Sequence, residues 1–264
     1  MIDFNEYAKA KENAKESLFK YTLLARSSIA MIAVSVWTVF CSILCIILCS
    51  IIKSPKFFDR YIYYWARFIL WAFNLEVRVN GIENLPGKRG GLLLFNHASL
   101  FDVPVLMVAL SQTITFRFGA KIELFAIPFF GKAMRAIGML PIARHQREKV
   151  LKLYKKSLTN VENGFWYALA PEGTRQKHKD IGGFKKGPFW FAIHGQLNVV
   201  PIVITGALDA LPKSDWVPCQ SAWSHIVEVH ILPPISAQGL SEDEITQLQG
   251  RVRSSMLKVF NEPT

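Results

Sequence analysis

The longest feature of the hydrophobic pattern is a charge-free segment near the N-terminus. Residues 27–52 contain no Asp, Glu, Lys or Arg, and their length exceeds the ~20 residues that cross a bilayer core as a helix. Residues 1–26 mix charged and apolar positions and indicate a short amphipathic helix. Residues 57–74 combine many aromatic side chains with charged ones such as Asp59, which is typical of a water–lipid interface. Two arrangements fit this pattern: a spanning helix followed by an interfacial helix, or a hairpin that dips into one leaflet.

From residue 75 onward, short apolar runs alternate with amphipathic ones. The pattern predicts strands at 76–80, 92–95, 113–119, 140–142, 165–170, 199–205 and 225–232, and helices at 102–110, 147–162, 188–194 and 241–260. Strands that alternate with helices favour an α/β fold with a mostly parallel sheet flanked by helices. We therefore predict two parts, N-terminal membrane-anchoring helices over residues 1–74 and an α/β domain over residues 75–264.

The composition of the chain indicates an anionic partner but does not identify which kind. Lys and Arg number 31 against 20 Asp and Glu, and the net charge of +11 suits an anionic membrane surface, a nucleic acid or an acidic partner. The aromatic residues gather in the membrane-like segment rather than among the charges, which argues against nucleic-acid binding. Cys41, Cys45 and Cys49 lie four apart in the apolar run and indicate a packing face. With the remote Cys219 they form no disulfide or zinc pattern, so we expect no metal site and a reducing, cytosolic face for the α/β domain.

A polar cluster follows the strand predicted at residues 92–95. Asn96 and His97 come directly after it, and Asp102 lies five positions beyond the histidine. In one continuous helix His97 and Asp102 would point about 140° apart, so they can meet only across a bend, with Asp102 in the first turn of the next helix. An aspartate on one imidazole nitrogen leaves the other nitrogen free to accept a proton from a hydroxyl. The cluster predicts a general base and its partner; the alternative is an ordinary loop histidine beside an N-cap aspartate.

A second polar cluster follows the strand predicted at residues 165–170. It reads Pro-Glu-Gly-Thr-Arg over residues 171–175 and supplies a carboxylate, a glycine, a hydroxyl and a guanidinium. Open α/β sheets bind ligands at the carboxyl ends of their strands, where both clusters fall. The alternative is a plain turn in which Glu172 pairs with Arg175.

Basic residues near the two clusters are candidates for binding an anion. Lys121 and Arg144 lie between the clusters in the sequence, and a glycine-rich basic loop follows at residues 182–187. An arginine offers paired donors to a phosphate, and a loop that opens a helix suits an anion. Taken singly, each of these residues fits a solvated surface charge better than a phosphate ligand.

The two clusters resemble motifs of a known family. Residues 96–102, Asn-His-Ala-Ser-Leu-Phe-Asp, resemble the His-four-residues-Asp motif of the glycerolipid acyltransferases, and residues 171–175 resemble their Pro-Glu-Gly-Thr-Arg motif. The resemblance covers residues 76–205 and is closest to the 1-acyl-glycerol-3-phosphate (lysophosphatidate) acyltransferases. A second block, a fourth block and the lead-in also match, at residues 121–144, 200–204 and 79–86.

This resemblance implies an enzyme that moves a fatty acyl chain from a thioester to lysophosphatidate and makes phosphatidate for phospholipid synthesis. It implies that His97 is the base and Asp102 its partner. The acceptor site would contain Glu172, Gly173, Thr174 and Arg175, with Arg175, Lys121 and Arg144 near the phosphate. Ala170 stands where the family often has Phe, and Gln176 where it often has Ser. These departures leave the acceptor and the acyl-chain preference open.

The resemblance implies no cofactor, but acyl-CoA or an acyl carrier protein thioester as co-substrate, and membrane lipids as partners. We expect the protein at the inner (cytoplasmic) membrane with its active site on the cytosolic face. Because a thioester is already activated, no covalent enzyme intermediate is required, and nearby backbone N–H groups would hold the developing oxyanion. Ser99 lacks a nucleophile-elbow pattern and is not expected to attack the thioester. Residues 103–110 and 124–130 form either plain core or the lining of an acyl tunnel.

Two other functions fit the sequence less well. One is acylation of a different lysophospholipid, or acyl exchange between phospholipids, which would make Lys121 and Arg144 less necessary. The other is a catalytically silent lipid-binding protein at the membrane surface. The intact His97, Asp102 and Glu172 argue against the second.

Overall fold

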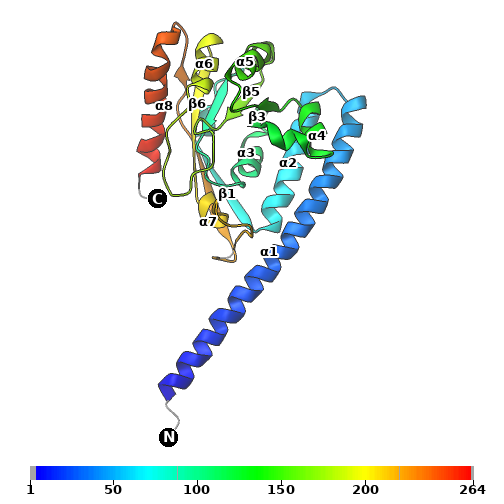
Figure 1. Ribbon diagram of the computed structural model, residues 1–264, viewed down its shortest axis with the longest axis vertical. Helices are drawn as coiled ribbons and strands as arrows, with labels where there is room; N and C mark the ends of the chain where they lie inside the picture. The colour runs from blue at the N-terminus through cyan, green and yellow to red at the C-terminus, as the bar shows by residue number, and fades with distance from the viewer. Residues whose placement is uncertain (1–3, 88, 220, 263–264) are drawn as a thin grey trace.

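A long helical hairpin lies along one side of an α/β unit (Figure 1). The computed structural model describes residues 4–87, 89–219 and 221–262. The hairpin consists of α1 (Phe4–Ile51) and α2 (Pro55–Ala72). The segment predicted as a short amphipathic helix and the charge-free segment form one continuous α1, because neither Gly nor Pro interrupts its sequence. The N-terminal part of α1 extends beyond the α/β unit (Figure 1).

The two hairpin helices pack closely against each other. The Tyr61 hydroxyl donates to the carbonyl of Cys41 (2.5 Å), and the Trp65 indole donates to Thr38 Oγ1 (3.2 Å). Cys41 and Cys45 are buried in the hairpin, so the prediction that the cysteines mark a packing face is confirmed. The choice between the two membrane arrangements stays a prediction, because α1 followed by α2 fits either of them.

The α/β unit is built on one eight-stranded sheet with the order β1-β7-β6-β2-β5-β3-β4, and β8 pairs with β6. Neighbouring strands are parallel, except that β6 is antiparallel to β7 and to β8. The predicted mostly parallel sheet is therefore confirmed. The strands are β1 (Leu75–Asn80), β2 (Leu92–Phe95), β3 (Phe116–Lys121), β4 (Leu140–Ile142), β5 (Trp166–Leu169), β6 (Asn198–Thr205), β7 (His225–Ile231) and β8 (Ile235–Ser236).

Helices cover both faces of the sheet. On one face α2 and α3 share a hydrophobic core with Leu93 and Phe95, and on the other α5, α6 and α8 share a core with Leu92 and Leu94. Burial on both sides explains why β2 is an unbroken apolar run. The helices that follow the hairpin are α3 (Asp102–Leu110), α4 (Phe130–Ala136), α5 (Arg147–Glu162), α6 (Gly187–His194), α7 (Ala207–Ala210) and α8 (Ile245–Phe260), with 3-10 turns η1 (Ile82–Asn84), η2 (Ile122–Ala126) and η3 (Glu242–Glu244).

Strand β3 begins later than the pattern predicts. The amides of Thr113 and Ile114 donate to the carbonyl of Leu110 (2.9 and 3.0 Å) and close the end of α3 instead of joining the sheet. The strand then continues to Lys121, beyond its predicted end. This shift places Lys121 at the carboxyl end of β3.

A buried ion pair joins α2 to the sheet. Asp59 Oδ1 accepts from Arg117 of β3 at 2.6 Å, and these side chains are only 7% and 2% exposed. Asp59 Oδ2 also accepts from the Thr115 hydroxyl (2.5 Å). The interpretation of Asp59 as a charge at the water–lipid interface is therefore wrong, because Arg117 compensates its charge inside the protein. The boundary between residues 74 and 75 stays a prediction, since the hairpin and the α/β unit share one hydrophobic core.

Candidate functional site

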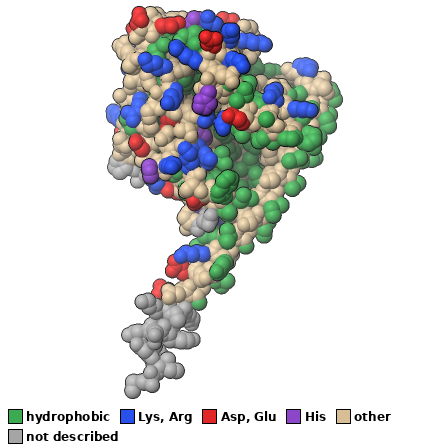
Figure 2. Space-filling view, viewed as in Figure 1, with side chains coloured by type: hydrophobic (Ala, Val, Ile, Leu, Met, Phe, Trp, Pro, Cys, Tyr) green, Lys and Arg blue, Asp and Glu red, His purple; other side chains and the backbone are tan. Residues whose placement is uncertain are grey.

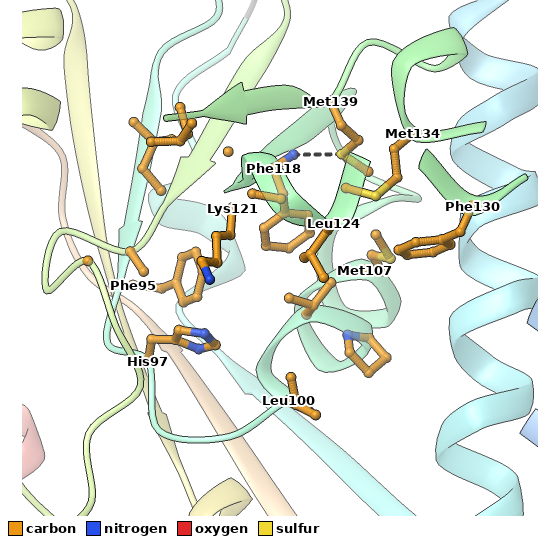
Figure 3. A pocket seen from close by; sticks show the side chains of 18 of the residues that line it. Phe95, His97, Leu100, Met107, Phe118, Lys121, Leu124, Phe130, Met134 and Met139 are labelled. Atoms are coloured by element: carbon orange, nitrogen blue, oxygen red, sulfur yellow. Dashed lines mark hydrogen bonds between the residues drawn. The ribbon is translucent and has the colours of Figure 1, made fainter. Parts of the chain in front are cut away.

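His97 and Asp102 meet across the bend that follows β2. The Nδ1 atom of His97 lies 2.8 Å from Oδ2 of Asp102, the first residue of α3. The Asp102 side chain is 1% exposed and that of His97 is 17% exposed. None of the residues that the structure describes hydrogen-bonds the Nε2 atom of His97, and the ring points into a cavity (Figure 3). The imidazole is therefore anchored on one side and open on the other.

Asp102 also shapes the loop between β2 and α3. Its Oδ2 atom accepts hydrogen bonds from the amides of Ala98 (2.8 Å) and Ser99 (2.9 Å) in addition to His97. One carboxylate oxygen thus fixes both the imidazole and the backbone around it. These two amides are committed to Asp102, so they are not donors for an oxyanion as long as the loop keeps this conformation.

Two buried polar residues tie the same loop to the rest of the sheet. The Asn96 side chain donates to the carbonyl of Ile204 (2.9 Å) and accepts from its amide (2.7 Å), which bridges the ends of β2 and β6. Ser99 is fully buried, and its hydroxyl donates to the carbonyl of Leu211 (3.0 Å). Ser99 therefore holds the loop in place, and it is not among the described residues that line the cavity into which His97 points.

Glu172 holds the backbone of His97 in place. Its Oε1 atom accepts from the His97 amide (2.9 Å), and its Oε2 atom accepts from the Gly182 amide (3.2 Å). The Gln176 amide in turn donates to the His97 carbonyl (2.7 Å). Burial raises the pKa of the Glu172 carboxyl above its ordinary value, and the two amide hydrogen bonds offset this only in part. The two sequence clusters thus form one hydrogen-bonded unit at the ends of β2 and β5.

A cavity of about 1250 Å³ opens beside His97. It exceeds the ~300–1,000 Å³ of most small-molecule sites. Its wall is largely apolar and comes from both the α/β unit and the hairpin. The residues labelled in Figure 3 include Phe95, Met107, Phe118, Leu124, Phe130, Met134 and Met139. Segments 103–110 and 124–130, which the sequence assigned to either plain core or an acyl tunnel, both contribute residues to this wall.

Several Lys and Arg side chains also line the cavity, and this set is called the cationic rim below. Lys121 and Arg144 both line the cavity, and Lys121 is half-exposed with its ammonium 3.4 Å from Glu123. Their role at a phosphate stays a prediction. The structure adds Lys185 and Lys186 from the basic loop, and it adds Arg147, which the sequence reading missed. Arg147 opens an amphipathic helix and looked like an ordinary surface charge. The combination of an apolar interior and a cationic rim suits an amphiphilic anion.

Only part of the second cluster, residues 171–175, lines the cavity. Gly173 lines the cavity with φ at 73°, a left-handed conformation that favours glycine. Glu172, Thr174 and Arg175 are not among the described residues that line it. The exposed Thr174 hydroxyl and the Arg175 carbonyl instead accept hydrogen bonds from Lys213 (3.2 and 2.7 Å). The acceptor-site role of these three residues stays a prediction.

The contribution of the hairpin to the site was missed from the sequence. Tyr61, Trp65 and Cys45 line the cavity together with the α/β residues. The aromatic and apolar residues of α2 repeat at helical spacing, but the pattern alone could not distinguish contact with protein from contact with lipid. Within residues 4–87, 89–219 and 221–262, no group of three or more His, Cys, Asp or Glu could hold a metal ion.

Comparison with known proteins agrees with this architecture. A family model described as Acyltransferase matches residues 76–205. A crystal structure of the 1-acyl-sn-glycerophosphate (LPA) acyltransferase PlsC from Thermotoga maritima superposes with a TM-score of 0.73 at 22% sequence identity, covering 92% of this chain and 99% of that one. At this identity the likeness shows the fold alone.

Sequence relatives are more specific. A 1-acyl-sn-glycerol-3-phosphate acyltransferase of Arabidopsis thaliana chloroplasts is 32% identical over 56% of this chain and 41% of its own length. The human 1-acyl-sn-glycerol-3-phosphate acyltransferase alpha is 27% identical over 86% of this chain and 78% of its own. The 1-acyl-sn-glycerol-3-phosphate acyltransferase of Pseudomonas aeruginosa is 30% identical over 72% of both chains. The chain described above therefore belongs to the 1-acyl-sn-glycerol-3-phosphate acyltransferase family.

Proposed function

We propose that this protein transfers a fatty acyl chain from an acyl thioester to the free hydroxyl of lysophosphatidate and so makes phosphatidate for phospholipid synthesis. The observation that carries the proposal is the position of His97. Its free nitrogen faces an apolar cavity large enough for an acyl chain, next to a cationic rim. The names of the relatives support the same acceptor.

In the proposed reaction, Nε2 of His97 takes the proton of the acceptor hydroxyl while its oxygen attacks the thioester carbonyl. The new C–O bond forms, the C–S bond breaks, and the departing thiolate receives the proton from the imidazolium. Asp102 orients the ring and stabilises its positive charge. Ser99 takes no part, since it is buried and bonded to Leu211.

The basic rim provides a site for the phosphate monoester of lysophosphatidate. We expect Lys121→Ala and Arg144→Ala each to raise KM for lysophosphatidate by about tenfold or more, because each removes a charged hydrogen bond to the phosphate. The measurement is the initial rate of phosphatidate formation by the purified protein at varied lysophosphatidate in mixed micelles. Lys132→Ala, an exposed lysine on α4, is the matched control.

The same assay tests the acceptor. Wild type should prefer lysophosphatidate over lysophosphatidylcholine, whose phosphate is a diester, and this preference should shrink in both rim variants. Equal rates with the two acceptors in wild type would show that the acceptor is a broader class of lysolipid and not lysophosphatidate in particular. An unchanged KM for lysophosphatidate in both variants would show that Lys121 and Arg144 do not bind its phosphate.

Glu172 and its neighbours complete the acceptor side. In this proposal Glu172 holds the His97 loop through two backbone amides, and Gly173 lets the acceptor approach the backbone at the cavity. Thr174 and Arg175 lie beside this point and complete the acceptor pocket once the phosphate is bound. The donor is acyl-CoA or an acyl carrier protein thioester, and the cationic rim suits the anionic carrier in either case.

The hairpin holds the site at a membrane in this proposal. Helix α1 is long and apolar enough to cross a membrane over Glu12–Ile51. One side of it packs on α2 and α4, while Ile29, Ile32 and Val36 are exposed, and Figure 2 shows hydrophobic side chains along this outer side. We infer that this outer side contacts lipid, with the active site on the cytosolic face of the inner membrane.

A further inference from the structure

The loop of residues 212–219, here called the Trp216 loop, carries an almost fully exposed tryptophan at the rim of the cavity. Trp216 is 89% exposed and also lines the cavity. A tryptophan side chain is large and mostly apolar, and such side chains are concentrated at the water–lipid interface of membranes. The exposure of the Trp216 side chain therefore indicates that it contacts another surface.

The Trp216 loop is held firmly at both ends, so the exposed position of its tip is set by the fold. Lys213 donates to the carbonyl of Arg175 (2.7 Å). Cys219 is buried, and its amide donates to the carbonyl of Ala210 (2.7 Å). The loop carries one charge of each sign, Lys213 and Asp215, and both precede Trp216, so the charges of the loop cancel and its contact surface is apolar rather than cationic.

Two other apolar side chains share the rim with Trp216. Leu100, in the loop after His97, is 59% exposed, and Leu124 of η2 is 39% exposed, and both line the cavity. Three separate segments thus present exposed apolar side chains around one opening. Figure 2 shows the hydrophobic hollow between the α/β unit and the hairpin, with Lys and Arg side chains beside it. A soluble anionic substrate would need only the charges, whereas a bilayer surface matches the apolar rim as well.

The base of the Trp216 loop adjoins α1 where its apolar run begins. Cys219 Sγ and the Arg26 guanidinium both donate to the carbonyl of Phe73 (3.5 and 3.4 Å). Arg26 is the last charged residue before the charge-free residues 27–52, and it stacks on Trp223 at 4.6 Å. The loop therefore lies beside the polar end of the lipid-facing segment, where interfacial tryptophans are expected.

We propose that the Trp216 loop is a second membrane contact, in which the Trp216 indole inserts into the interfacial region of the bilayer at the cavity mouth. Together with Leu100 and Leu124 it seals the mouth onto the lipid surface, so that a lysolipid reaches His97 without its acyl chain crossing water. This inference rests on the proposed function. It adds a contact made by the α/β unit that is separate from the hairpin.

Fluorescence quenching by lipid tests the contact directly. The full-length protein is reconstituted in phosphatidylcholine vesicles with or without bromine on the acyl chains, and wild type is compared with Trp216→Phe and Trp37→Phe. The difference in emission between wild type and each variant is the contribution of the tryptophan that was replaced. The contribution of Trp37, which lies on α1, reports on the lipid contact of the hairpin. We expect bromine to quench both contributions. Quenching of the Trp37 contribution alone would overturn the proposal, and quenching of neither would overturn the membrane placement of the hairpin as well.

A kinetic comparison separates a membrane role from a structural one. For Trp216→Glu, we expect the ratio of the rate with long-chain lysophosphatidate in vesicles to the rate with a monomeric short-chain lysophosphatidate to fall by about tenfold or more, because a charge replaces a large apolar contact. An equal loss with both substrates would show that Trp216 acts only on the fold or on the site. A Trp216 emission change on adding acyl carrier protein without membranes, together with no bromine quenching of the Trp216 contribution, would identify a protein as the partner and would also overturn the proposal.

Discussion

Replacing His97 with alanine should lower the rate of phosphatidate formation by about 10²–10⁴-fold, the usual contribution of a positioned general base. The effect should fall on kcat more than on KM, because the cavity and its basic rim are unchanged. The measurement is product formation from lysophosphatidate and acyl-CoA by purified wild type and variant, with folding checked by circular dichroism.

The control for this prediction is His178→Ala, at an exposed histidine in the loop after the second cluster. It should keep the wild-type rate. Near wild-type activity in a folded His97→Ala variant would remove the general base from the mechanism, whatever the acceptor is.

The second large effect concerns stability. Asp59→Ala leaves the Arg117 guanidinium buried without its counter-ion, and we expect the free energy of unfolding to fall by about 3–5 kcal/mol, as for other broken buried ion pairs. Chemical denaturation in detergent, followed by circular dichroism, measures this loss.

The double variant Asp59→Leu with Arg117→Leu separates charge from packing. It should recover much of the lost stability, because no unpaired charge then remains in the core. Asp215→Ala, at an exposed aspartate, is the matched single control and should unfold like wild type. A loss below about 1 kcal/mol in Asp59→Ala would mean that the pair behaves like a surface salt bridge.

Some parts of this structure could be predicted from the sequence because local chemistry determines them. Strand β2 matches its predicted bounds since it is buried on both faces and reads as a pure apolar run. Helix α5 does so because its apolar positions repeat at helical spacing. The contact between His97 and Asp102 followed from their spacing, which allows them to meet only across a bend.

Other features depend on contacts between distant parts of the chain. The alternating pattern of β7 reveals a strand but not that it runs antiparallel to β6. Nothing near Asp59 identifies its partner Arg117, which lies 58 positions away. The apolar face of α2 likewise could not reveal that it lines the cavity rather than facing lipid.

The most direct test of the central claim is the initial-velocity pattern of phosphatidate formation when acyl-CoA and lysophosphatidate are both varied. If the hydroxyl activated by His97 attacks the bound thioester directly, both substrates must be present together, and the double-reciprocal lines should intersect. The protein should carry no acyl group after incubation with acyl-CoA alone. Parallel lines together with an acylated protein would show a covalent intermediate and contradict the account, as would the absence of phosphatidate with either acyl-CoA or an acyl carrier protein thioester as donor.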